Sequence, residues 1–143
     1  MNLCLFSVSV ITSIENHSLH LPDYRGHWCI FCDAYLKSLH SIEQGIADAN
    51  GATLAVTAEP EHFLPITRKN TGYAGKALID AEHKLLSELK CRGVIDIAIS
   101  EKKGYANGMA QPAVIVLKRD GTVLERWACV PGVVSAVKML TTR

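Results

Sequence analysis

The stretch that decides the fold runs from Tyr24 to Cys32 and reads YRGHWCIFC. After it, apolar side chains recur at three- and four-residue steps up to Asn50-Gly51, a typical helix stop, which predicts an amphipathic helix that begins near Cys29. The expected inward positions of this helix are Tyr35, Leu39, Ile42, Ile46 and Ala49. A thiol at the start of a helix lies near unpaired backbone N–H groups and the positive end of the helix dipole. We therefore expect Cys29 to ionise more readily than a free cysteine.

The spacing of the two cysteines suits thiol–disulfide chemistry. Cα atoms three residues apart on a helix are roughly 5 Å apart, within the range that a disulfide accepts. Cys29 would attack as the thiolate, and Cys32 would resolve the mixed disulfide that forms. Arg25 and His27 lie just upstream and add positive charge, and Trp28 offers an apolar platform beside the reactive sulfur.

Two other interpretations of this cysteine pair are a metal site and a structural role. A zinc site needs a second pair of ligands, but Cys91 and Cys129 are isolated and no histidine pair has ligand spacing. We therefore expect neither a metal nor a cofactor. Two core cysteines that happen to be three residues apart remain possible, because free cysteine is often buried.

Outward from this helix, the chain alternates strands and helices. We expect strands at 3–12, 52–58, 76–79, 113–117 and 122–128, and helices from Cys29 to about 49, at 60–68, 80–90 and 132–140. Residues 13–24 are expected to be loop because Pro22 breaks regular structure. Residues 101–109 are expected to be a polar loop. Residues 93–100 fit either a strand or a buried loop. Asp80 is a candidate N-cap, and Asp120-Gly121 predicts a hairpin turn. This order predicts a three-layer α/β/α sandwich with a mixed central sheet.

Bulk composition sets limits on the class of protein. The chain has 143 residues, which suits one domain over 1–143, with residues 1–23 as an atypical N-terminal segment. A net charge of +1 gives no electrostatic reason to expect nucleic acid or a membrane as partner. The five cysteines include one close pair, which favours a reducing, cytoplasmic setting over a secreted disulfide scaffold. The apolar stretch 3–11 lacks a preceding basic residue and a cleavage site, so a strand is favoured over a signal peptide.

The stretch from Tyr24 to Cys32, with Ala34-Tyr35-Leu36 after it, resembles the Y-R-G-x-W-C-P-F-C segment of peroxiredoxin-like proteins. These form the AhpC/TSA (redoxin) branch of the thioredoxin superfamily. The resemblance extends to Trp127 and includes Gln111-Pro112-Ala113 at a strand start.

The resemblance implies a thioredoxin-like fold, with Cys29 as attacking thiol and Cys32 as resolving thiol. It also implies a cis-proline at Pro112 opposite them, although the residues alone favour a trans bond. Trp28, Gln111 and Pro112 would then contact the substrate. The implied substrate is a protein disulfide or a hydroperoxide, and the implied electron donor is a thioredoxin- or glutathione-type reductant.

Three departures from the family pattern separate the possible functions. Gly26 stands where peroxiredoxins have threonine, which favours thiol–disulfide exchange over peroxide reduction. Ile30 replaces the usual proline, and residues 15–23 are polar where the family has an apolar strand. These last two favour the alternative, a non-catalytic thioredoxin-fold module that binds a partner or senses redox state.

Two further residues have both a functional and a structural interpretation. Cys91 lies between two basic residues, which would lower its pKa, but a surface thiol at a helix end is the simpler interpretation. Arg126 could bind an oxyanion near the site, although a solvated strand arginine is simpler.

Overall fold

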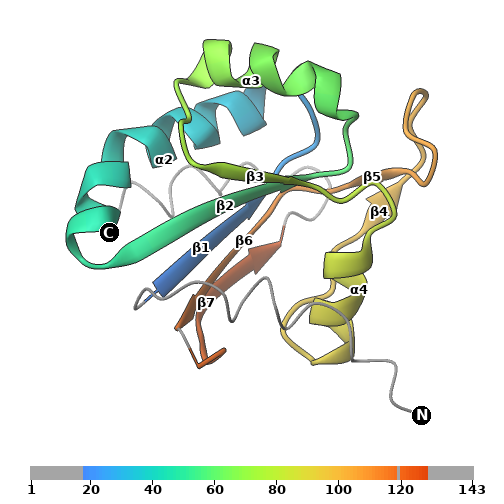
Figure 1. The fold of residues 1–143 in the computed structure, drawn as a ribbon. Helices are drawn as coiled ribbons and strands as arrows, with labels where there is room; N and C mark the ends of the chain where they lie inside the picture. The colour runs from blue at the N-terminus through green and yellow to red at the C-terminus, as the bar shows by residue number, and fades with distance from the viewer. Residues whose placement is uncertain (1–17, 119, 129–143) are drawn as a thin grey trace.

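The structure is a computed structural model that describes residues 18–118 and 120–128. Its main sheet has five strands in the order β3-β2-β1-β6-β7, and a two-stranded ribbon, β4-β5, lies apart from it (Figure 1). The strands are β1 (Ser18–Asp23), β2 (Gly51–Thr57), β3 (Lys76–Ile79), β4 (Ile99–Ser100), β5 (Met109–Ala110), β6 (Ala113–Lys118) and β7 (Val123–Ala128). The helices are α2 (Ile30–Asp48), the 3-10 turn η1 (Glu61–Phe63), α3 (Leu64–Thr71) and α4 (Lys84–Cys91).

The sheet is mixed, as the sequence predicts. Strand β1 pairs in parallel with β2, and β2 pairs in parallel with β3, because a helix-containing crossover connects each pair. On its other side β1 pairs antiparallel with β6, which forms a hairpin with β7. The turn between them closes with Gly121 at φ 90°, so the predicted Asp-Gly hairpin is confirmed. The predicted strands at 52–58, 76–79, 113–117 and 122–128 are also confirmed.

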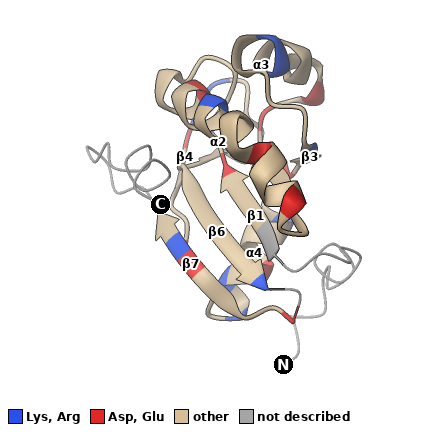
Figure 2. Cartoon of the chain, turned by 90° about the vertical axis from the view of Figure 1, so that its left-hand side faces the viewer, with Lys and Arg blue, Asp and Glu red and all other residues tan. Residues whose placement is uncertain are grey.

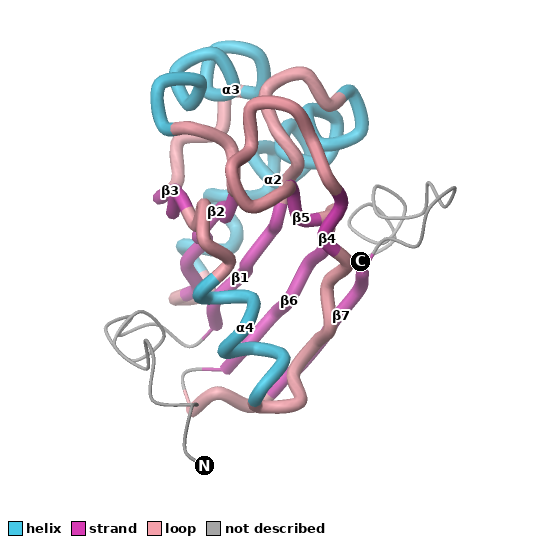
Figure 3. Tube along the Cα trace, turned by 90° about the vertical axis from the view of Figure 1, so that its right-hand side faces the viewer, coloured by secondary structure: helices cyan, strands magenta, loops and turns pink. Residues whose placement is uncertain are grey.

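Helices cover both faces of the sheet, so the three-layer α/β/α arrangement is confirmed. Helix α2 lies in front of the sheet in Figure 2, whereas α4 lies in front of it in the opposite view of Figure 3. Two separate cores result, because successive strand residues point to opposite faces. Leu54 and Val56 pack with the α4 leucines, and Ala55 between them packs with Leu36 of α2.

The expected loop at 13–24 is wrong for its second half, because residues 18–23 form β1 in the middle of the sheet. Pro22 is tolerated there because its nitrogen, which has no hydrogen to donate, faces β2 and leaves the pairing with β6 intact. The Tyr24 N–H points toward β2 and donates to the Val56 carbonyl at 2.9 Å, so the Pro22 nitrogen two residues earlier faces β2 as well. The parallel register with β2 skips Leu21 and Pro22, while the antiparallel register with β6 runs through both.

Two expectations about helix detail also need correction. Ile42 and Ala49 are not inward: α2 packs mainly through its first half, where Leu36 is completely buried, whereas Ile42 and the C-cap Ala49 are exposed. The N-cap of α4 is His83 in the left-handed conformation rather than Asp80. Asp80 still caps the helix from outside, since its carboxylate accepts the backbone N–H groups of Lys84 and Leu85 at 2.8 and 3.0 Å.

Some expectations lie outside the described residues. These are the strand at 3–12, the helix at 132–140, and Cys129. The single-domain organisation of residues 1–143 stays a prediction. Within the part of the chain that the structure describes, no helix combines the length and the apolar character needed to cross a membrane.

Candidate active site

Cys29 is the N-cap of α2, as the sequence predicts. Its backbone is extended there, and its Sγ accepts the backbone N–H of Cys32 at 3.2 Å. The Cys29 N–H in turn donates to the Gly26 carbonyl at 3.1 Å, which closes a tight turn into the helix. Both cysteines are free thiols and buried, and Cys29 is only 1% exposed. The sulfur therefore takes the place that a serine or aspartate oxygen occupies in ordinary helix caps.

Arg25 contacts both sulfurs through two different groups. Its guanidinium Nη2 donates to Cys29 Sγ at 3.3 Å, and its backbone N–H donates to Cys32 Sγ at 3.3 Å. The guanidinium also lies over the Trp28 ring, with its carbon 5.4 Å from the ring centroid. Positive charge and two N–H donors thus converge on the pair of thiols.

These contacts separate the acidities of the two thiols. Hydrogen bonding from the Cys32 side chain is the main cause that lowers the pKa of Cys29 to about 6. The Cys32 backbone N–H and the Arg25 guanidinium act in the same direction, while burial opposes them. The same hydrogen bond, together with burial, raises the pKa of Cys32 well above its ordinary value. At neutral pH the pair therefore holds one proton, with the negative charge on Cys29.

Two residues far away in the sequence hold the segment 25–28 that enters the helix. The buried Glu59, which follows β2, accepts the backbone N–H of His27 at 2.8 Å and contacts its Nδ1 at 2.9 Å. The Tyr105 hydroxyl lies 2.9 Å from the Arg25 carbonyl and 3.0 Å from Glu59 Oε2, and accepts the Trp28 indole N–H at 3.0 Å. Sequence reasoning missed both residues, because nothing in the local pattern relates them to the motif.

The same two residues explain why position 26 is glycine. A Cβ on Gly26 would contact Glu59 Oε2, the Tyr105 hydroxyl and the Trp28 indole nitrogen more closely than real Cβ atoms approach such groups. The space that a threonine would need is therefore filled by a hydrogen-bond network. Gly26 was the one feature of the sequence that pointed toward Glu59 and Tyr105. Its departure from the threonine of the family pattern, beside the cysteines, indicates that other groups fill this space.

The large apolar side chains next to the two cysteines in the sequence are exposed. Ile30 and Phe31, between the two cysteines, are 80% and 51% exposed, and Trp28 is 38% exposed. The Lys102 ammonium lies 4.4 Å from the centroid of the Trp28 ring. An exposed cluster of large apolar residues is typical of a surface that contacts another molecule.

Gln111 and Pro112 lie in the chain between β5 and β6. Gln111 extends the β4–β5 ribbon: its N–H donates to the Ala98 carbonyl at 2.9 Å, and its side-chain amide donates to Ser100 Oγ at 2.9 Å. The expected cis bond at Pro112 is wrong, because none of the described peptide bonds is cis. A trans bond keeps the chain extended from the ribbon into β6. Their contact with substrate, like that of Trp28, stays a prediction.

Asp23, at the end of β1, is a second buried acid that the sequence did not point to. Neither of its carboxylate oxygens has a hydrogen-bond partner. Burial raises the pKa of Asp23 well above its ordinary value, and the nearby charge of Asp80 adds to the effect.

The remaining candidates lie away from these thiols. Arg126 donates to the Val94 carbonyl at 2.8 Å, so it connects β7 to the loop after α4. Cys91 is exposed at the end of α4, as expected, but it is disulfide-bonded rather than free. Among residues 18–118 and 120–128, no three histidine, cysteine or acidic side chains are grouped as metal ligands would be.

Comparison with known proteins locates the fold. No family model and no curated protein sequence matches the chain. Solved structures do match. The Xanthomonas campestris bacterioferritin comigratory protein, described for its alkyl peroxide reduction activity, gives a TM-score of 0.67 at 16% identity, over 91% of this chain and 79% of that chain.

Two Mycobacterium tuberculosis proteins match similarly. The peroxidoxin BcpB gives a TM-score of 0.69 at 11% identity, over 93% of this chain and 84% of that chain. A secreted disulfide oxidoreductase homologous to E. coli DsbE gives 0.61 at 14% identity, over 90% and 81%. The chain therefore has the peroxiredoxin-like form of the thioredoxin fold.

Proposed function

We propose that the protein is a thiol–disulfide oxidoreductase in which Cys29 attacks and Cys32 resolves. The observation that carries this proposal is the convergence of the Arg25 guanidinium and the Cys32 N–H on the Cys29 sulfur at the N-cap of α2. These contacts favour the thiolate, which is the nucleophile in disulfide exchange. The disulfide oxidoreductase among the structural neighbours supports the same chemistry.

The reaction proceeds in two balanced steps. The Cys29 thiolate attacks one sulfur of the substrate disulfide, so that a mixed disulfide forms and the other substrate sulfur leaves as a thiolate that takes up a proton. Cys32 then loses its proton and attacks the Cys29 sulfur, which releases the second substrate thiol. The substrate gains two electrons, and the protein is left with a Cys29–Cys32 disulfide. A thioredoxin- or glutathione-type dithiol or thiol reductant returns these two electrons.

The exposed side chains around the site fit a protein as the substrate. Cys29 is buried, so a substrate must reach its sulfur past the surface formed by Trp28, Ile30 and Phe31. These large apolar groups suit a polypeptide that carries the disulfide. Gln111 and Pro112 are proposed to contact the same polypeptide from the start of β6.

Peroxide reduction is the second candidate, because two of the matched structures are described as an alkyl peroxide reductase and a peroxidoxin. The Cys29 thiolate would attack the peroxide oxygen, releasing an alcohol and leaving a sulfenic acid, which Cys32 would convert to a disulfide with loss of water. Gly26 weighs against this, since the groups beside it fill the space where peroxiredoxins place a threonine.

Turnover with each substrate class tests the proposal. The reduced protein is offered a protein disulfide and, separately, an alkyl hydroperoxide, each with a regenerating reductant. We expect disulfide turnover in the wild type and its loss in both Cys29→Ser and Cys32→Ser. Turnover of the hydroperoxide alone would establish the second candidate, and no turnover of either would leave the non-catalytic binding or sensing module. The cytoplasmic setting stays a prediction.

A further inference from the structure

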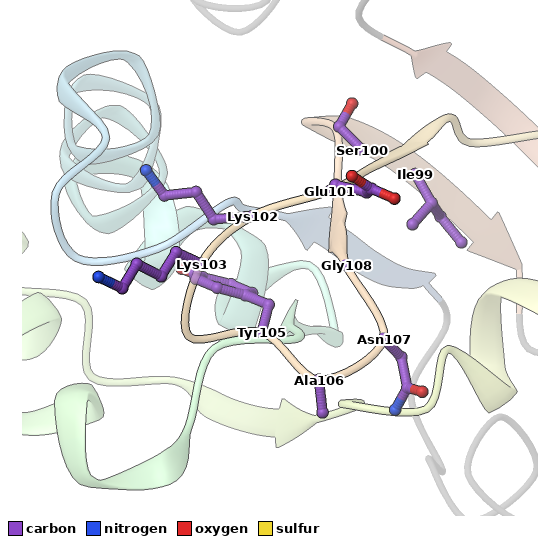
Figure 4. Close-up of a pocket in the computed structure, with 9 residues that line it drawn as sticks. All are labelled: Ile99, Ser100, Glu101, Lys102, Lys103, Tyr105, Ala106, Asn107 and Gly108. Carbon is purple, nitrogen blue, oxygen red and sulfur yellow. The ribbon is translucent and has the colours of Figure 1, made fainter.

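A loop far from the cysteines reaches the site through one side chain. This loop, residues 101–108, connects β4 to β5, and its Tyr105 hydroxyl contacts Arg25, Trp28 and Glu59. Figure 4 shows Tyr105 extending from the loop on the same side as Lys102 and Lys103. The three contacts of the hydroxyl join the loop to the segment that positions the thiols.

The loop is shaped to present Tyr105. Two turns flank this residue: its N–H donates to the Lys102 carbonyl at 3.1 Å, and its own carbonyl accepts the Gly108 N–H at 3.1 Å. Gly104 and Gly108 both have positive φ, 91° and 82°, which glycine adopts without strain. The rest of the loop bends around a shallow hollow of about 630 Å³ and is mostly exposed. Tyr105 is thus the loop's hydrogen-bonded attachment to segment 25–28, while Asn107 and Gly108 hold the other end of the loop to Ala81 and His83.

The hydroxyl contacts the same residue whose two donors reach the sulfurs. Arg25 donates to Cys32 through its N–H and to Cys29 through its guanidinium, and Tyr105 holds the carbonyl of the same residue. Glu59 holds a second backbone group of the segment, the His27 N–H. The chain just after the Arg25 α-carbon is therefore held by two groups that do not themselves contact a sulfur.

We propose that Tyr105, held by Glu59, is a positioning residue that couples the docking of loop 101–108 to the reactivity of Cys29. The proposal rests on the proposed role of Cys29 as the attacking thiol. With the loop docked, the Arg25 guanidinium is held against the Cys29 sulfur and the Trp28 ring is held beside it. With the loop released, Arg25 is free to leave the sulfur, and the thiolate loses a hydrogen bond. A partner that displaces or retains the loop would thereby change the reactivity of the thiol.

The charged and titratable groups around Cys29 allow this effect to be separated from simple electrostatics. They are Arg25 and Cys32 in contact with it, and Tyr24, His27, Asp33, Glu59, Lys102 and Tyr105 in the surrounding elements. Tyr105 carries no charge at neutral pH. Its pKa, which is ordinarily about 10, is raised to about 12, mainly by burial. Removing its hydroxyl therefore changes positioning without changing the net charge near the sulfur.

The experiment is the rate of Cys29 alkylation as a function of pH in the reduced full chain, with Tyr105→Phe compared against Tyr73→Phe. The Tyr73 hydroxyl is a matched control, because it also has three partners, Thr53, the Ala55 N–H and the Lys76 carbonyl, but none in the segment 25–28. We expect Tyr105→Phe to raise the pKa of Cys29 by about half a unit, less than outright removal of the guanidinium, which lowers alkylation at pH 6 roughly two-fold. Tyr73→Phe should lower thermal stability and leave the pKa of Cys29 unchanged.

Glu59→Gln provides a second arm. Its amide oxygen can still accept the hydrogen bond from His27, and the loss of a negative charge near the sulfur by itself lowers the pKa of Cys29. A rise of that pKa in Glu59→Gln, smaller than in Tyr105→Phe, is therefore the result that a positioning role predicts. An unchanged profile in Tyr105→Phe, or an equal shift in Tyr73→Phe, overturns the proposal while the proposed function stands. A wild-type Cys29 that titrates like a free cysteine is a different result, because it removes the proposed function itself.

Discussion

Replacing Arg25 by methionine removes the positive charge from the Cys29 sulfur while keeping an unbranched side chain of similar length. The guanidinium Nη2 lies 3.3 Å from Sγ and is the only cationic group recorded in hydrogen-bond contact with it among the described residues. We expect Arg25→Met to raise the pKa of Cys29, because the thiolate loses a charge-assisted donor. Lys102→Met is the matched control: it removes a nearby cation that lies over Trp28 and not on the sulfur.

The size of the shift follows from the contact. A hydrogen bond to a charged group contributes about 1.5–3 kcal/mol, and about 1.36 kcal/mol corresponds to one pKa unit. Arg25 is partly exposed, so solvent screening favours the lower end of this range. From a wild-type value of about 6, the pKa of Cys29 should rise to about 7 in Arg25→Met.

Alkylation of the reduced protein, followed from pH 5 to 9 with mass spectrometry to identify the modified cysteine, measures this shift. We expect the midpoint to move upward in Arg25→Met, with at least roughly five-fold slower alkylation at pH 6. Arg25→Lys should lie between the two, because it keeps the charge and loses the planar fork. An unchanged midpoint in Arg25→Met, or an equal shift in Lys102→Met, would refute the reasoning.

Three further predictions concern stability. Gly26→Ala should lower the free energy of unfolding by about 1–3 kcal/mol, because the added Cβ overlaps the oxygens that hold segment 25–28. Gly45 has open space around it in α2, so Gly45→Ala should instead raise the free energy of unfolding by about 0.5–1 kcal/mol in the same urea titration. Leu36→Ala should cost about 2–5 kcal/mol and the exposed Ile42→Ala far less, and equal losses in thermal unfolding would contradict the packing of α2. The pKa of Cys29 is lowered on folding, so its contribution to stability is complete above the unfolded pKa of about 8.5 and disappears as pH falls through about 6. In urea unfolding, the free energy of unfolding of the reduced wild type should therefore rise relative to that of Cys29→Ser from pH 6 to about 8.5. A difference that stays constant over this range would contradict the lowered pKa.

The sequence predicted the parts of the fold that depend on local pattern. The start of α2 at Cys29, the buried strand after it and the hairpin at Gly121 all follow from periodicity, capping and turn chemistry within a few residues. Strand β1 could not be predicted in this way. Pro22 and the polar residues around it argue against a central strand, and the strand forms because its antiparallel partner β6 accepts a register that does not need the missing N–H.

The site was predictable only in its centre. Cys29 and Cys32 lie three residues apart, so their juxtaposition follows from the helix alone, and Arg25 lies just upstream, where the sequence already shows a positive charge. Glu59 and Tyr105 are brought to the site by the ends of β2 and of the β4–β5 ribbon, at sequence separations of 32 and 80 residues from the groups they contact. Gly26 indicates that other groups stand beside the cysteines, but no local pattern identifies them as Glu59 and Tyr105, because that depends on how the sheet and the ribbon are arranged in space.

The difference in acidity between the two thiols has a redox consequence. A thiolate stabilised by its surroundings stabilises the reduced dithiol relative to the disulfide. The Cys29–Cys32 disulfide should therefore be a stronger oxidant than a disulfide between two cysteines of ordinary pKa. Arg25→Met weakens this stabilisation, which gives the pKa shift of Cys29 an independent counterpart in the reduction potential.

Trapping of the mixed disulfide tests the central claim most directly. Cys32→Ser and Cys29→Ser variants are each incubated with the same protein disulfide, and the adduct is mapped by mass spectrometry under non-reducing conditions. If Cys29 attacks and Cys32 resolves, the Cys32→Ser variant accumulates a stable adduct on Cys29, and the Cys29→Ser variant forms none. An adduct on Cys32 in the Cys29→Ser variant at a comparable rate, or no adduct in either variant, would contradict the assignment of these two thiols.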